Sequence, residues 1–296
     1  MKRLILGVAG AAAAGALVWG GLAFSSIAEP VSIAADQGNV ARGAYLARAG
    51  GCIACHTDIA GGGKPLAGGA PLDTPFGTFY APNLTQDPQQ GIGNWTLEDF
   101  ARALRQGVSP EGEPYYPAFP YSFYTRLSDQ DIADLWAAFR TVPAVAQPSR
   151  EQQLEFPFNI RSGLRLWQQL YLERQRFQPS ADADQRFNRG AYLVEGAAHC
   201  AACHTPRNLL GGLDPDAAFQ GASGLPDGGS APAITAAALQ ANGWTVEDLA
   251  YALKSGITPD GDVLGGTMGE VIRDGTSFLS QADREAIAHY LLNNRS

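Results

Sequence analysis

A short pattern of cysteine and histidine occurs twice in this chain of 296 residues and uses all four of its cysteines. The pattern Cys-x-x-Cys-His spans residues 52–56 and again residues 200–204. Two thiols at this spacing can add to the two vinyl groups of one haem, and the histidine that follows can ligate its iron. The sequence therefore predicts two covalently bound haem c groups, with thioether bonds from Cys52, Cys55, Cys200 and Cys203 and iron ligands His56 and His204.

Other uses of paired cysteines fit the pattern less well. A zinc ribbon needs its two Cys-x-x-Cys pairs about 15–20 residues apart, whereas these pairs lie in separate halves of the chain. A thioredoxin-type redox pair accompanies a βαβ pattern, and no such pattern is present. A disulfide in an exported protein would not require a histidine at the same place twice.

Methionine is the usual second axial ligand of electron-transfer haems, and it raises the potential. The chain has two methionines, of which Met1 opens the N-terminal segment. We therefore expect Met268 to be the distal ligand of the second haem. The position that corresponds to Met268 in the first half of the chain is occupied by Phe119.

The first haem thus has no methionine to serve as its second ligand, and three interpretations stay open. In the first, the iron is five-coordinate and Phe119 covers it. In the second, water or a nearby side chain ligates the iron. In the third, a histidine from elsewhere in the chain ligates it. The side chains considered are Tyr115, Tyr116, Tyr121, Tyr124 and Lys64, and the histidines are His199 and His289.

The two motifs belong to a longer internal repeat. Arg-Gly-Ala-Tyr-Leu at 42–46 recurs at 189–193, upstream of each motif. Downstream, related segments recur at 81–85 and 231–235, at 95–100 and 244–249, and at 103–110 and 252–259. Each copy ends in a helical pattern that a serine opens, at 128–140 and 280–292.

These patterns predict an all-α fold, because strand-like alternation is absent. We expect a first domain at 38–143, a second at 185–296, and a linker at 144–184 with a short helix within 161–175. The helices that carry Tyr45 and Tyr192 should pack on the terminal helices through Phe139 and Leu291.

Composition narrows the class of protein further. With 35 glycines, 19 prolines and 17% charged residues, the chain is rich in loops, and bound haem could replace part of a side-chain core. The net charge of −8 disfavours nucleic acid as a partner, since phosphate binding needs a basic surface. Apolar content of 45% excludes disorder.

The one long apolar run, residues 4–28, follows Lys2 and Arg3 and makes residues 1–30 a candidate anchor or signal segment. The run is long enough to span a bilayer as a retained anchor, and a cleaved export signal is the alternative. Lys2 and Arg3 would stay on the inner side of the membrane. In a Gram-negative cell the rest of the chain would then lie on the periplasmic side of the inner membrane, or in the soluble periplasm after cleavage.

Further residues are candidates for contacts around the haems. A histidine that binds metal normally donates its other ring N–H to an acceptor. For His204 we expect a backbone carbonyl near Pro206, and the first motif has no proline at that place. Candidates for hydrogen bonds to the haem propionates are Arg207, Asn83, Trp95 and Trp244.

At these residues the chain resembles the cytochrome c subunits of membrane-bound bacterial dehydrogenases, such as quinoprotein alcohol dehydrogenase and the flavin-dependent gluconate and fructose dehydrogenases, and the cytochromes that serve molybdenum hydroxylases. Beside the two haem motifs, the resemblance rests on residues 42–46, 81–85, 116–121, 204–208 and 265–271. It implies a string of class I cytochrome c domains that carries electrons from a periplasmic dehydrogenase subunit to ubiquinone or another carrier.

The chain departs from this family in two ways. It has two haem motifs where the three-subunit alcohol dehydrogenases have three or more. It also has no methionine at Phe119 or at Leu127, a second position that resembles a ligand position in some relatives.

Two kinds of function follow from these observations. The first is electron transfer by a membrane-anchored dihaem cytochrome docked to a redox protein. The alternative uses an open first haem, either for catalysis of the kind seen in dihaem peroxidases and thiosulfate dehydrogenases or for ligand sensing.

Overall fold

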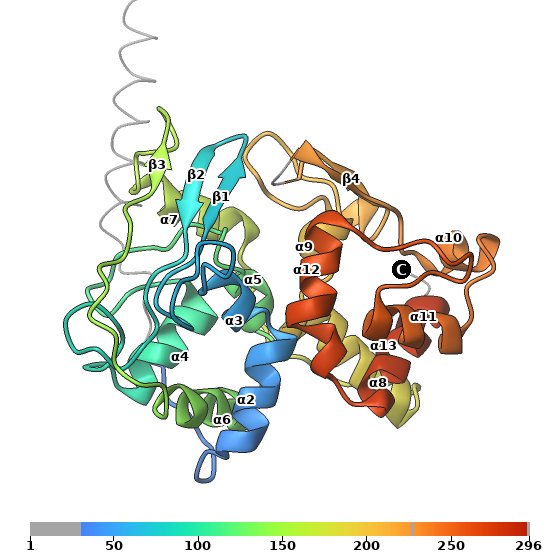
Figure 1. Ribbon diagram of the computed structural model, residues 1–296, viewed down its shortest axis with the longest axis horizontal. Helices are drawn as coiled ribbons and strands as arrows, with labels where there is room; N and C mark the ends of the chain where they lie inside the picture. Colours follow the sequence, from blue (N-terminus) through green and yellow to red (C-terminus); the bar gives the residue numbers. More distant parts are fainter. Residues whose placement is uncertain (1–30, 226–227, 295–296) are drawn as a thin grey trace, which may run out of the picture.

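The computed structural model describes residues 31–225 and 228–294 (Figure 1). The predicted anchor or signal at 1–30 lies outside these residues. Within the described part of the chain, no helix combines the length and apolar character needed to cross a membrane.

Helices form most of the regular structure, in two sets that follow the sequence repeat. The first half contains α2 (Val40–Ala49), α3 (Cys52–Cys55), α4 (Leu97–Gln106), α5 (Tyr121–Tyr124) and α6 (Asp129–Phe139). The second contains α8 (Gln185–Tyr192), the π-helix η1 (Leu193–Ala197), α9 (Ala201–His204), η2 (Pro215–Ala217), α10 (Ala236–Ala241), α11 (Val246–Ser255), α12 (Gly266–Asp274), η4 (Thr276–Phe278) and α13 (Gln281–Asn293). In Figure 1 the two sets lie side by side, and α3 faces α12, which it contacts.

Side-chain caps define the starts of the repeated helices. The hydroxyls of Ser128 and Ser280 accept hydrogen bonds from the first turns of α6 and α13, as the sequence predicted. Thr96 caps α4 in a capping box with Asp99, and Thr245 caps α11. Such caps satisfy amide groups that have no partner within the helix.

Short strands are an addition that the sequence did not predict. β1 (Pro71–Thr74) and β2 (Gly77–Tyr80) form an antiparallel hairpin, and β3 (Gln153–Leu154) pairs with β2. β4 (Ala222–Ser223) pairs with β5 (Ser230–Ala231). The all-α prediction was wrong in this detail, because strands of two to four residues are too short to show alternation in the sequence.

The segment between the halves is packed against both of them. Its helix α7 (Gly163–Tyr171) falls within the predicted segment. The amide of Gln168 donates to the carbonyls of Gln106 and Gly107 at the end of α4. The indole of Trp167 donates to the carbonyl of Leu210 in the second half, at 2.9 Å.

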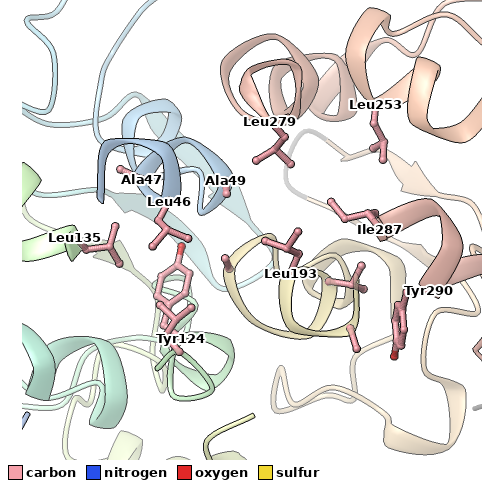
Figure 2. Close-up of a cluster of buried hydrophobic side chains, with 14 of the residues drawn as sticks. Leu46, Ala47, Ala49, Tyr124, Leu135, Leu193, Leu253, Leu279, Ile287 and Tyr290 are labelled. Atoms are coloured by element: carbon pink, nitrogen blue, oxygen red, sulfur yellow. The ribbon is translucent and has the colours of Figure 1, made fainter. Parts of the chain in front are cut away.

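The buried core of each half forms where its first and last helices cross. α2 packs on α6, and α8 packs on α13. Figure 2 shows the buried side chains of both halves side by side, with Leu46 and Leu135 from the first and Leu193 and Ile287 from the second. Phe139 and Leu291 are buried here, as expected.

The glycine of the repeated Arg-Gly-Ala-Tyr-Leu segment allows these helices to approach closely. A Cβ atom on Gly43 would lie 1.8 Å from the carbonyl oxygen of Asp134, and one on Gly190 would lie 2.0 Å from that of Ala286. Both distances are far below contact distance, so any larger residue must push the helices apart.

We therefore expect Gly43→Ala and Gly190→Ala to lower the free energy of unfolding by about 3 kcal/mol each, the upper part of the range for overpacked cores. Denaturant titration followed by circular dichroism measures the change. Gly196→Ala is the matched control, because its Cβ would meet no atom closer than 3.9 Å. Equal stability of all three variants would contradict the packing argument.

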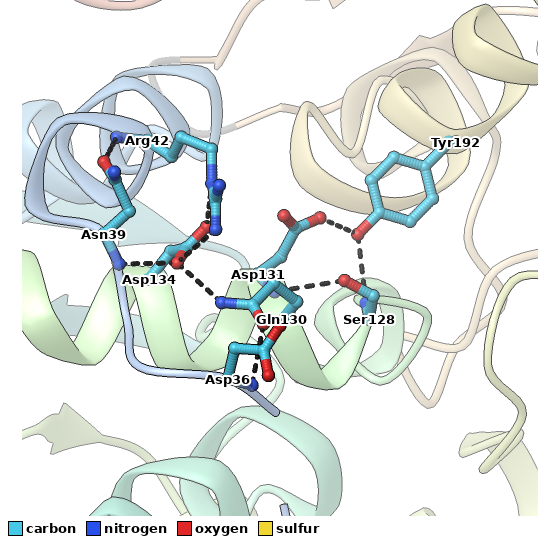
Figure 3. Close-up of polar contacts among 8 residues, drawn as sticks. All are labelled: Asp36, Asn39, Arg42, Ser128, Gln130, Asp131, Asp134 and Tyr192. Atoms are coloured by element: carbon cyan, nitrogen blue, oxygen red, sulfur yellow. Dashed lines mark hydrogen bonds and ion pairs between the residues drawn. The ribbon is translucent and has the colours of Figure 1, made fainter. Parts of the chain in front are cut away.

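Two tyrosines of the same repeated segment connect the halves reciprocally. The hydroxyl of Tyr45, on α2, donates to Asp283 at 2.6 Å and accepts from the backbone N–H of Ser280 at 3.0 Å, both in the first turn of α13. Figure 3 shows the counterpart: Tyr192, on α8, donates to Asp131 and accepts from the N–H of Ser128 at the start of α6. Each half therefore caps the terminal helix of the other.

Removing either hydroxyl should weaken this interface. Tyr45→Phe and Tyr192→Phe each leave a backbone N–H without its partner and take one hydrogen bond from a carboxylate, and we expect a loss of about 1–2 kcal/mol in the free energy of unfolding. Urea denaturation tests this. Tyr251→Phe, at an exposed tyrosine of α11, should leave stability unchanged, and a loss as large as that of the other two would count against the interface.

Candidate haem sites

Both Cys-x-x-Cys-His motifs lie on one-turn helices at equivalent places in the two halves. The first corresponds to α3, which follows the left-handed Gly51 (φ 66°), and the second to α9. None of the four cysteines forms a disulfide. Burial raises the pKa of Cys52 and of Cys200 to about 12, so these thiols are neutral in the protein chain.

The motif histidines are held in the same way in both halves. The Nδ1–H of His56 donates to the carbonyl of Pro82 at 2.7 Å, and that of His204 donates to the carbonyl of Pro232 at 2.8 Å. No hydrogen bond joins Nε2 of either ring to a described residue. This leaves Nε2 with a lone pair for iron, the arrangement that metal-bound histidine needs.

This geometry corrects the expected acceptor for His204. The acceptor is Pro232, and Pro206 is not involved; the first half uses the equivalent Pro82. Burial lowers the pKa of His56 to about 4 and lowers that of His204 as well. Both rings are therefore neutral and able to bind a metal at neutral pH.

The threonine after each histidine was missed as a site residue. The hydroxyls of Thr57 and Thr205 accept from the amides of Leu66 and Phe219, both at 3.0 Å. Leu66 and Phe219 are buried and both have a left-handed φ of 59°. The repeated His-Thr dipeptide could have indicated this role, since each threonine shapes the loop behind its histidine.

Aromatic rings gather around Phe119, where the first half has no methionine. Its ring centroid lies 5.8 Å from those of Tyr115 and Tyr124 and 6.1 Å from that of Tyr121. The hydroxyl of Tyr124 donates to the carbonyl of Gly50 at 2.5 Å, and that of Tyr121 donates to the carbonyl of Tyr115 at 3.2 Å.

The other candidate ligands of the first iron are placed as follows. Tyr116 donates to the carbonyl of Phe158, and burial raises the pKa of all four candidate tyrosines. Lys64 is exposed on its loop, and His289 pairs with Asp184 in the second half. Leu127 is buried, with 2% of its surface exposed. The hydroxyl of Tyr115 forms no hydrogen bond to the described residues.

Met268 lies on a helix, α12, and is partly buried against the hydrophobic core. α12 contacts α11 of its own half and also α3 of the first half. Desolvation and the negative charges of Cys203 and Glu270, both in the second half, raise the pKa of Cys55.

Comparison with known proteins agrees with this geometry. The cytochrome c family model matches residues 40–139. A diheme cytochrome c-type protein of Cereibacter sphaeroides is 42% identical over 266 residues, which cover 89% of this chain and 88% of that protein. The chain belongs to the cytochrome c family.

Other relatives of this cytochrome are subunits of dehydrogenases. One of the nicotinate dehydrogenase subunits of Pseudomonas putida is 41% identical over 84% of the chain, which spans 21% of that protein. The gluconate 2-dehydrogenase cytochrome c subunit of Pantoea cypripedii is 40% identical over 93% of the chain, which spans 63% of that protein. The resemblance to dehydrogenase cytochrome subunits is thus confirmed.

The residues of this cytochrome fit covalently bound haem c. The cysteine pairs would form the thioether bonds, and the Nε2 atoms left without hydrogen bonds would meet iron. Among the described residues, no three side chains of His, Cys, Asp or Glu converge to hold a bare metal ion. Bound haem would supply one-electron redox chemistry at its iron.

The predicted hydrogen bonds to the haem propionates stay predictions. In the structure, Asn83 and Arg207 donate to backbone carbonyls instead. Both amide hydrogens of Asn83 donate to backbone carbonyls, of Val145 and Gln147. Asn83 therefore fixes the loop that carries Pro82. The guanidinium of Arg207 donates to the carbonyls of Ala202 and Gly211.

The two tryptophans keep a free donor within the described part of the chain. Trp95 and Trp244 are partly buried at equivalent places, and no described residue accepts from either indole. These N–H groups are available for a ligand or water.

Proposed function

We propose that this cytochrome is a dihaem electron-transfer subunit that receives electrons from a dehydrogenase and passes them to quinone or to another cytochrome. The observation that carries the proposal is the equivalent hydrogen bond in both halves, from the motif histidine to a proline carbonyl. The same metal-binding tautomer is set twice, which supports a haem at each motif and two class I domains, at 38–143 and 185–296.

The chain's own residues serve electron transfer by staying fixed. The carbonyls of Pro82 and Pro232 orient the two imidazoles, and Thr57 and Thr205 hold the loops behind them. His204 is buried and His56 is partly buried, and hydrogen bonds fix both rings, so little has to reorganise when an electron arrives or leaves.

The cellular location that we propose for the protein rests on the apolar run within residues 1–30. An apolar run of this length supports anchoring on the periplasmic side of the inner membrane, with a soluble periplasmic form as the alternative after cleavage. The net charge of −8 favours a redox partner with a basic docking surface, where opposite charge mainly raises the association rate.

The haem count of the purified full chain tests the proposal. The pyridine haemochrome assay should give two haems per chain, and one in each of the paired variants Cys52→Ser/Cys55→Ser and Cys200→Ser/Cys203→Ser. Reduction of the intact cytochrome by a purified partner dehydrogenase and its substrate then tests the direction of electron flow. One haem in the intact chain, or haem that no dehydrogenase reduces, would overturn the proposal.

A second candidate function rests on the first half alone. Neither Phe119 nor Leu127 is a methionine, and the hydroxyls of Tyr116, Tyr121 and Tyr124 are occupied by backbone carbonyls. An iron without a sixth protein ligand could bind a small molecule and support peroxidase-like or sensing chemistry.

A further inference from the structure

The segments that precede the two haem motifs meet at one backbone carbonyl, that of Gly50. Gly50 lies two residues before Cys52, and its carbonyl accepts from the hydroxyl of Tyr124 at 2.5 Å. The same carbonyl accepts from Nε2–H of His199 at 3.4 Å, and His199 directly precedes Cys200. His199 therefore connects the segment before one motif to the segment before the other.

The two copies differ at this point by one residue. In the first copy, residues 46–51 separate Tyr45 from Cys52. In the second copy, residues 193–199 separate Tyr192 from Cys200, which is one residue more. The π-helix Leu193–Ala197 absorbs the extra residue, whereas α2 is a regular α-helix. Single-residue insertions of this kind are frequent at functional sites.

The residue directly before the first cysteine is left-handed in both copies. In the first copy it is Gly51, with φ 66°, and in the second it is His199, with φ 39°. Glycine adopts this backbone freely, whereas histidine is strained in it. Because glycine makes the same turn in the first copy, the turn alone does not explain a histidine in the second.

The His199 side chain has a defined place at the contact between the halves. Its ring centroid lies 6.0 Å from that of Phe123 and 5.8 Å from that of Tyr124, both on α5 of the first half. A Cβ on Gly51 would lie 3.8 Å from its Nε2. Burial lowers the pKa of His199, so the ring is a neutral hydrogen-bond donor.

We propose that His199 is a positioning residue that holds together the segments preceding the two haem motifs and thereby sets the rate of electron transfer between the haems. This inference rests on the proposed function, because it requires a haem at each motif. In the transfer step one electron leaves the reduced site, which becomes oxidised, and reduces the other. No bond breaks and no proton or further reactant is needed.

Three variants of the full, haem-loaded chain test the proposal. His199→Gly makes the second copy like the first and removes the backbone strain together with the side chain. His199→Phe keeps an aromatic ring but removes the N–H donor. His289→Gln is the control, because His289 lies on α13 and pairs with Asp184 in the second half.

Pulse radiolysis places a single electron on the protein, and optical spectra follow its redistribution between the two haems. We expect roughly tenfold slower redistribution in His199→Gly and His199→Phe, the scale of effect that small misplacements of reacting groups produce, and an unchanged rate in the control. Amide hydrogen exchange at 50–52 should be faster in both His199 variants, while haem content stays at the wild-type level.

The outcomes separate this inference from the proposed function. Wild-type redistribution rates in both His199 variants would overturn the role of His199 and leave the proposed function standing. Slower redistribution in His289→Gln to the same degree would also overturn it, because the effect would not depend on the contact with Gly50. A wild-type chain without electron exchange between two haems would overturn both proposals.

Discussion

Cyanide added to the ferric protein, and carbon monoxide added to the ferrous protein, will bind to one haem and leave the other unchanged. The haem that binds is expected to be the one on residues 52–56. Phe119 and Leu127 provide no ligand atom, and three of the four nearby tyrosine hydroxyls already donate to backbone carbonyls. Burial raises the pKa of these tyrosines, which disfavours the phenolate that iron would need.

Optical and EPR titrations measure this result directly, since an iron without a strong sixth ligand is high-spin until cyanide binds. Phe119→Met and Leu127→Met are the matched variants. A thioether that reaches the iron should make it low-spin and abolish cyanide binding. Tyr115→Phe tests the remaining hydroxyl and should not change the spectrum. Two low-spin irons that ignore both ligands would contradict the expectation and remove the second candidate function.

Replacement of Met268 should change the potential of one haem only. Methionine opposite histidine raises the potential of a haem, and axial ligands set haem potentials over about 0.8 V. For Met268→Ala we expect a fall on the order of 0.1 V, together with loss of the near-infrared band of methionine-ligated ferric haem. Spectropotentiometric titration of the full chain gives both midpoint potentials.

Val271→Ala is the matched control, because Val271 lies on the same helix α12 and is partly exposed. It should leave both potentials at their wild-type values. The same titration in Cys52→Ser/Cys55→Ser identifies the haem concerned. The prediction assigns Met268 to the second haem, so the band should persist in that variant. Its disappearance there would assign Met268 to the first haem instead, which α12 also approaches.

Local signals explain why the helices were predictable. Ser128 and Ser280 cap the terminal helices through amides three residues away, so all the atoms involved lie in one short stretch of sequence. The short helix of the linker has its apolar residues at helical spacing for the same reason. The strands escaped prediction because each is at most four residues long and depends on a partner strand.

Contacts between distant segments were not predictable in this way. Pro82 and Pro232 accept from the motif histidines through backbone carbonyls, and any residue type carries a carbonyl. The composition therefore contains no sign of which carbonyl faces the ring. The helices that carry Tyr45 and Tyr192 were expected to pack on the terminal helices, but no signal showed that each tyrosine hydroxyl reaches the terminal helix of the opposite half.

The sequence by itself determined the chemistry of this cytochrome: paired thiols with a histidine beside them, a duplicated frame around them, and one methionine where two ordinary haems would use two. These features depend on residue types and on short spacings, which can be read directly from the sequence. Only the tertiary structure decided how the copies are joined. The hydroxyl of Tyr45 meets Asp283, and His199 meets Gly50, only after the halves pack against each other. A contact between residues so far apart in the chain depends on the whole fold, and no local pattern encodes it.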